Sequence, residues 1–143
     1  MQSLHPLIVH FPIALLLTAT ALEILALIAR RPQLHRFALW NLCLGTLGAG
    51  ATVLTGLQAA AVAKHSFEIW EVMELHEHLG ITTLILGLGL CALRLWKRDR
   101  LSRRVRVATL AAMLVMAGTL GYGAYLGGRL VYEFGVGGRF GQR

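Results

Sequence analysis

Charged residues are scarce in this chain: they make up 15% of its 143 residues, whereas hydrophobic residues make up 56% and the mean hydropathy is +0.62. A soluble domain of this length cannot bury so many apolar side chains in one core. The composition therefore excludes a soluble globular protein and predicts a protein that crosses a membrane several times.

Three motifs are missing as well. Without a Cys-x-x-Cys-His motif, haem cannot be attached covalently in the usual way, and we interpret Cys43 and Cys91 as buried residues that stay reduced. No Ser or Cys lies in a recognisable motif with a general base that could activate it as a nucleophile. A hydrolase is therefore disfavoured, and we expect no catalytic residues. No Lys or Arg precedes the first apolar stretch, whereas Arg30 and Arg31 follow it. This order is opposite to that of a cleavable signal peptide, so the first span should remain.

Long uncharged stretches cover roughly residues 7–29, 37–63, 79–96 and 105–128, each near or above the ~20 residues that a helix needs to cross a bilayer. Four spans predict an all-α integral membrane four-helix bundle, formed by a single domain over residues 1–143. The segment 65–78 between the second and third spans predicts a short amphipathic helix lying at the membrane interface.

Basic residues are concentrated on one side of the predicted bundle. Ten of the 14 Lys and Arg lie in the first and third loops and the adjoining helix ends: Arg30, Arg31, Arg36, Arg94, Lys97, Arg98, Arg100, Arg103, Arg104 and Arg106. The positive-inside rule places these loops in the cytoplasm and both termini outside, as expected for a multi-pass protein of a bacterial inner membrane. The net charge of +7 is then explained by loops that face anionic lipid, so we expect no nucleic-acid partner.

Small residues recur at helical spacing in three spans, which predicts close helix packing or room for a planar cofactor. The stripes, with the polar residues that share them, are Asn41, Gly45, Gly48, Thr52, Thr55 and Ala59 in the second span, His76, Gly80, Thr83 and Gly87 in the third, and Gly118, Gly121 and Gly128 in the fourth.

Five of the six histidines fall on the predicted outer side: His5, His10, His65, His76 and His78. Neutral imidazoles gathered at one membrane face indicate a ligand set for a metal or haem. His10 lies inside the first span, where an ionisable group is a functional candidate. His76 and His78 point about 200° apart on a helix, so only one of them can join His10 at a shared site. For His5, His65 and the loop residue His35, a structural role is favoured.

Other polar residues leave alternatives open. Glu23 lies inside the first span, where a charge is costly unless it is paired. A hydrogen bond to Asn41, an ion pair with Arg94 or a role in proton handling would each account for it. Tyr122 and Tyr125 either donate hydrogen bonds to the histidine site or belong to an aromatic belt at the interface.

The opening LHPLIVHFPIALL, Glu23, the histidine before the third span and the closing GGRLVYEFGVGG together resemble a bacterial membrane family filed as domain of unknown function 2231. The resemblance implies a four-helix membrane protein whose relatives sometimes share a chain with Rieske or c-type cytochrome domains. His5 and His10 match the family's opening histidines, and either His76 or His78 matches the later one. We expect any electron partner of this chain to be a separate protein.

The favoured hypothesis is a b-type haem electron-transfer subunit, with His10 and either His76 or His78 as the axial ligands of one outer haem. The Glu-rich outer loop would then dock a basic partner, such as a soluble cytochrome. One alternative is a protein that binds or transports a divalent transition metal through His65, Glu68, Glu71, His76 and His78. The other is a structural or assembly subunit of a membrane complex.

Overall fold

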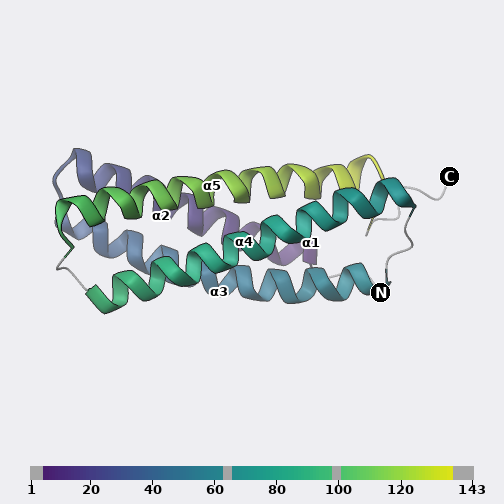
Figure 1. Ribbon diagram of the computed structural model, residues 1–143, viewed down its shortest axis with the longest axis horizontal. Helices are drawn as coiled ribbons and strands as arrows, with labels where there is room; N and C mark the ends of the chain where they lie inside the picture. The colour runs from purple at the N-terminus through teal and green to yellow at the C-terminus, as the bar shows by residue number, and fades with distance from the viewer. Residues whose placement is uncertain (1–4, 63–65, 98–100, 137–143) are drawn as a thin grey trace.

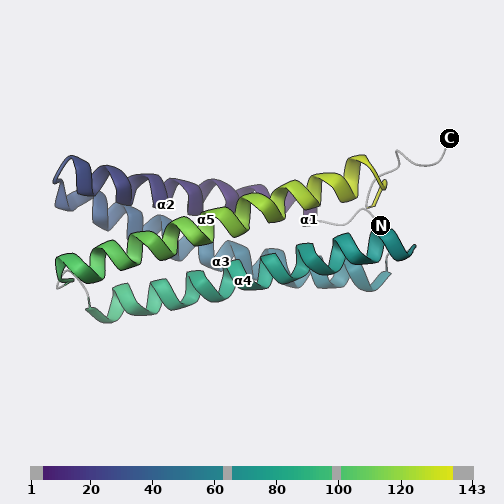
Figure 2. The ribbon, with the colours of Figure 1, turned by 45° about the horizontal axis from the view of Figure 1, so that its top comes forward.

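Five helices make up the computed structural model, which describes residues 5–62, 66–97 and 101–136. They are α1 (His5–Ile8), α2 (His10–Ile28), α3 (Pro32–Val62), α4 (Phe67–Lys97) and α5 (Arg103–Tyr132). Each of the four longer helices is long and apolar enough to cross a membrane, which confirms the predicted four spans. They run side by side along one long axis (Figures 1 and 2).

The four long helices form two hairpins, α2–α3 and α4–α5. Each helix packs against its hairpin partner and against one helix of the other hairpin, α3 against α4 and α2 against α5. The start of α2, the end of α3, the start of α4 and the end of α5 lie at one end of the bundle, on the right in Figure 1. We call this the histidine end, because it carries His5 and His76. The opposite end, which carries Arg94 and Arg106, is called the arginine end.

Local sequence explains several helix boundaries. Pro12 has no N–H to donate to the carbonyl of Ile8, and the helix is interrupted between α1 and α2 at Val9. At the start of α5 the Ser102 side chain accepts a hydrogen bond from the backbone N–H of Val105, a normal N-cap.

The expected interfacial helix over residues 65–78 is wrong for the described part of that segment. Residues from Phe67 onward form the first turns of α4, which continues to Lys97 without a break. No proline occurs within α4, and its early Glu, Leu and Met residues favour a helix, so nothing ends the helix before the apolar span.

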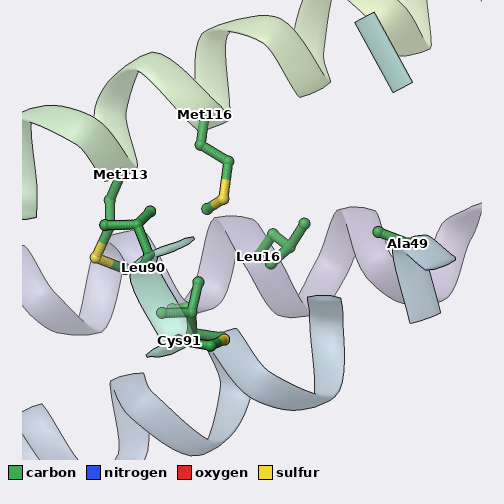
Figure 3. Close-up of a cluster of buried hydrophobic side chains, with 8 residues drawn as sticks. Leu16, Ala49, Leu90, Cys91, Met113 and Met116 are labelled. Atoms are coloured by element: carbon green, nitrogen blue, oxygen red, sulfur yellow. The ribbon is translucent and has the colours of Figure 1, made fainter. Parts of the chain in front are cut away.

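The middle of the bundle is a close-packed apolar core. Leu16, Leu42, Met113 and Met116 are fully buried, and Figure 3 shows Leu16, Met113 and Met116 among the core side chains that the helices direct between them. Glycines allow the close approach: a Cβ on Gly45 would lie 2.8 Å from the Leu16 side chain. The predicted packing role of small residues is therefore confirmed in α3.

Large apolar side chains cover the outside of the bundle. Apolar side chains that are at least half exposed include Leu25, Ile28, Phe37, Trp40, Leu47, Leu54, Phe67, Trp70, Ile85, Trp96 and Val115. Such a surface suits hydrocarbon rather than water, and the tryptophans near both ends of the bundle are typical of the two membrane interfaces.

The two hairpins repeat one another at an offset of 71 residues. By this offset Pro32, where α3 begins, corresponds to Arg103, where α5 begins. Few residues are identical between the two halves, but His5 matches His76, Gly50 matches Gly121, and Gly56 matches Gly127. The bundle is therefore built as two similar hairpins running in the same direction.

Candidate histidine site and buried arginine cluster

His5 is held by the backbone of α3. Its Nδ1 lies 3.0 Å from the carbonyl oxygen of Thr52 and 3.3 Å from the hydroxyl of Thr55. A carbonyl can only accept, so Nδ1 carries the hydrogen and donates it. The ring's Cε1 would be 3.0 Å from a Cβ on Gly56, so glycine leaves the space in which the ring lies.

His76 is held in the same way within the second hairpin. Its Nδ1 donates to the carbonyl oxygen of Gly123 across 2.7 Å. A Cβ on Gly127 would lie 3.0 Å from the His76 Cε1, so glycine again leaves space for the ring. In both hairpins the histidine is thus fixed by a carbonyl 47 residues further along the chain and adjoins a glycine four residues after that carbonyl.

The two rings meet between the hairpins. Their centroids are 6.2 Å apart and their planes are inclined by 89°. Because Nδ1 is the donor in each ring, Nε2 is the nitrogen that holds the lone pair in the neutral form, and neither Nε2 has a hydrogen-bond partner among the described residues. Burial, and then the nearby His76, lower the pKa of His5 from 6.5, while the Thr52 hydrogen bond opposes the shift. His5 is therefore a neutral imidazole with an available nitrogen.

A cavity of about 60 Å³ lies between the two hairpins, and neither His5 nor His76 is among the residues that line it. It is lined by residues from both hairpins, including Pro12, Thr52, Gly80 and Gly123, and its walls are almost entirely apolar. Thr52 and Gly123 also supply the carbonyls that hold the two rings. The cavity thus shares these two residues with the histidine site.

The other histidines predicted as ligands do not join this pair. The side chains of His10 and His78 are exposed, and His65 lies outside the described residues. The structure therefore brings together His5 and His76, whereas the sequence favoured His10 with His76 or His78. Whether any of these histidines binds a cofactor stays a prediction.

The expected mixed site of histidines and carboxylates has no counterpart in the described residues. Glu68 and Glu71 are exposed on the first turns of α4. Within residues 5–62, 66–97 and 101–136, no group of three or more His, Cys, Asp or Glu side chains is placed to hold a metal ion. Tyr122 and Tyr125 are exposed and stack on one another, 6.1 Å between centroids, so they face outward, as expected for an aromatic belt.

A second polar cluster is buried at the arginine end. Glu23 is 1% exposed, and its two carboxylate oxygens accept hydrogen bonds from His35 Nδ1 at 2.9 Å and Arg94 Nη1 at 2.7 Å. Arg94 Nη2 also donates to the His35 carbonyl at 2.9 Å, and the Arg106 guanidinium contacts His35 Nε2. We call these four residues the arginine-end cluster.

Two expectations about this cluster are resolved. The ion pair of Glu23 with Arg94 is confirmed, whereas the Asn41 amide donates to the Phe37 carbonyl of its own helix. The placement of His35 in a loop is wrong, because it lies in the first turns of α3 and is buried. His76 and Arg94 are 18 residues apart on α4, about 27 Å at 1.5 Å per residue, so the two polar sites lie near opposite ends of the spans.

The contacts between residues at the 71-residue offset reveal a pseudo-two-fold axis. His5 contacts His76, Glu23 contacts Arg94, and His35 contacts Arg106. Two equivalent residues can touch only if the axis passes between them, so all three pairs mark one axis along the bundle. His35 and Arg106 were not predicted as site residues, because these equivalent positions differ in residue type and only the folded bundle brings them together.

Comparison with known protein families gives a match over most of the chain. A family model described as "Predicted membrane protein (DUF2231)" matches residues 1–139. No curated protein and no solved structure matches the chain. The four-span bundle and this match over nearly the whole length agree with the resemblance seen in the sequence, and the chain belongs to the DUF2231 family of predicted membrane proteins.

Proposed function

We propose that this protein is a b-type haem electron-transfer subunit of a membrane, with one haem at the histidine end and His5 and His76 as its axial ligands. One observation carries the proposal: one ring from each hairpin is fixed through Nδ1 to a backbone carbonyl and keeps Nε2 available. Ligating histidines commonly hold their second nitrogen in this way. Because His10 and His78 are exposed, His5 replaces His10 in the proposed pair.

The donor set suits haem better than a bare metal ion. Structural and catalytic zinc sites use three or four protein ligands, whereas haem needs at most two, since the macrocycle supplies the rest.

A macrocycle also needs space, and the cavity of about 60 Å³ between the hairpins is much too small for it. The hairpins must therefore lie further apart at this level when haem is bound. Both ring anchors allow such a separation, because His5 bonds to Thr52 within the first hairpin and His76 bonds to Gly123 within the second. No anchoring bond crosses from one hairpin to the other.

When bound, haem would supply an iron that takes up and releases one electron. The residues of this chain would fix the site. The carbonyls of Thr52 and Gly123 orient the rings and increase the basicity of each Nε2. Burial would keep His5 neutral.

The surroundings favour electron exchange with a protein outside the cytoplasm. Glu68, Glu71 and Glu74 are exposed at the histidine end, where they would attract a basic partner such as a soluble cytochrome c or a Rieske-type protein. The concentration of Lys and Arg at the other end supports a location in a bacterial inner membrane with the arginine end in the cytoplasm.

Absorption spectra of the full chain, purified in detergent from haem-replete cells, test this proposal. The wild type and the control His10→Ala should show a Soret band that shifts on reduction. His5→Ala and His76→Ala should each lose it or convert it to a high-spin form. A colourless wild type would contradict the haem proposal. Elemental analysis would then decide whether His5 and His76 bind another metal or have a purely structural role.

A further inference from the structure

His35 is the member of the arginine-end cluster whose two ring nitrogens are both engaged. Nδ1 faces a carboxylate oxygen of Glu23 at 2.9 Å, and Nε2 faces the guanidinium of Arg106. A carboxylate accepts and a guanidinium can only donate. Nδ1 therefore carries the hydrogen, Nε2 holds the lone pair, and His35 is neutral in this arrangement.

Every helix packed around the ring contributes a charge to it: Glu23 comes from α2, Arg94 from α4 and Arg106 from α5. One carboxylate and two guanidiniums leave a net charge of +1 around the neutral ring. A proton on Nε2 would raise this charge to +2 and would set an N–H against the donors of Arg106. The ring can therefore take up a proton only if Arg106 leaves it.

The three charged neighbours are not held equally. Arg94 is 5% exposed and bonds both to Glu23 and to the backbone carbonyl of His35. Arg106 is less buried, begins the second turn of α5, and its one contact to the cluster is with Nε2. Arg106 can therefore move toward the water at the arginine end while the Glu23–Arg94 pair stays in place.

We propose that His35 is a proton-binding site served from the water at the arginine end, with Arg106 as its gate. When Arg106 turns outward, a proton from water binds the lone pair of Nε2, and no other covalent bond changes. Glu23 then stabilises the imidazolium through Nδ1–H. The proton replaces the charge that leaves with Arg106, so the buried cluster keeps a net charge of +1 in both states. This charge balance is why the exchange is feasible inside the bundle.

The site is independent of haem at the other end, and it gives the protein a way to take up a proton from one side of the membrane. Nitrogen-15 NMR of the full chain in lipid bilayers, with labelled histidine and carbon-13 arginine, measures the protonation state of His35 and its contact with Arg106 directly. The contact with an arginine guanidinium identifies the His35 signal. At pH 8 we expect a neutral ring with the hydrogen on Nδ1, and on acidification toward pH 5 an imidazolium that has lost its contact with the Arg106 side chain.

The variant Arg106→Gln removes the charge that opposes the proton. In this variant the imidazolium should form at a higher pH than in the wild type, because no guanidinium has to leave Nε2 first. Arg104→Gln, which removes an exposed charge from the same first turns of α5, should leave the transition where it is in the wild type. An equal shift of the His35 transition in both variants would contradict the proposed role of Arg106 as the gate.

The wild type alone can also overturn the proposal, so the test does not depend on the folding of a variant. A His35 that stays neutral down to pH 5, or that is protonated while its contact with Arg106 persists, would contradict the exchange of the proton for Arg106.

Discussion

At both ends of the bundle a histidine Nδ1 donates a hydrogen bond across helices, but the acceptors differ. His5 and His76 donate to backbone carbonyls, and no charged group adjoins their free Nε2 atoms among the described residues. His35 donates to a carboxylate and accepts from an arginine. The first arrangement suits a ligand for a metal centre, and the second suits a site for a proton.

The lowered pKa of His5 has a consequence for stability. Its folded-state pKa lies below the ordinary 6.5, so the unfolded chain binds more protons between these two values. The contribution of His5 is therefore fully present above pH 6.5 and is lost as the pH falls through the window below 6.5. We expect the thermal midpoint of the wild type to fall from pH 8 to pH 5 and to fall less in His5→Gln. His78→Gln, at an exposed position, should keep the wild-type slope. Equal slopes in all three proteins would contradict this account.

Among the charged groups, the buried pair of Glu23 with Arg94 is predicted to contribute most to the free energy of unfolding. Arg94→Met leaves Glu23 almost fully buried without its guanidinium, which should cost about 3 kcal/mol of unfolding free energy. The exposed control Arg104→Met should change it by no more than about 0.5 kcal/mol. Unfolding in mixed detergent micelles measures both, and a loss in Arg94→Met as small as in the control would refute the role of this pair.

At the scale of helices, the sequence predicted the packing role of glycine correctly in some spans but not in others. A Cβ on Gly87 of α4 would lie 2.6 Å from the Thr46 hydroxyl of α3, so this glycine sets the distance between the two hairpins. Gly118 and Gly121 of α5 have equally regular spacing, yet a Cβ on either would meet no atom within 4 Å. Spacing shows that residues share a helix face, but it does not show which face turns inward.

Two glycines of α4 provide a matched test of this distinction. Gly87→Ala should push α3 and α4 apart and cost about 1 to 3 kcal/mol of unfolding free energy. Gly89→Ala, which meets nothing within 4 Å, should be neutral or stabilise the protein by up to about 1 kcal/mol through helix propensity. If the two variants unfold alike, the close contact at Gly87 does not determine the packing.

The sequence also predicted helix boundaries unevenly. Length and hydropathy were enough to find four spans, because a bilayer requires about 20 apolar residues in each. The polar first turns of α4 were assigned to a separate interfacial helix because their charge pattern resembles a membrane surface, although no residue there stops a helix. His35 was missed for a related reason: its neighbours are basic, and only the packed structure places Glu23 beside it.

At the scale of the whole molecule, two similar hairpins surround one pseudo-two-fold axis. Identical residues at the histidine end let both hairpins present the same group to one point on the axis. At the arginine end the equivalent residues differ, Glu23 from Arg94 and His35 from Arg106, and they attract one another across the axis. Two identical Glu23 side chains at this position would repel, so divergence of the two halves stabilises this end.

The proposed orientation can be measured on intact cells. Glu74→Cys at the histidine end should react with a maleimide that cannot cross the membrane, whereas Arg104→Cys at the arginine end should react only after lysis. Both changes are made in a Cys43→Ala, Cys91→Ala background, which excludes labelling of the native cysteines. The reverse pattern would place the arginine end outside the cell and would exclude the proposed partners.

The most direct test of the central claim is the low-temperature electron paramagnetic resonance spectrum of the oxidised full-length protein. Ligation of one ferric haem by the imidazoles of His5 and His76 should give a low-spin signal. This is the result that ligation by His5 and His76 predicts. A high-spin signal, or no haem iron signal from haem-replete cells, would contradict it.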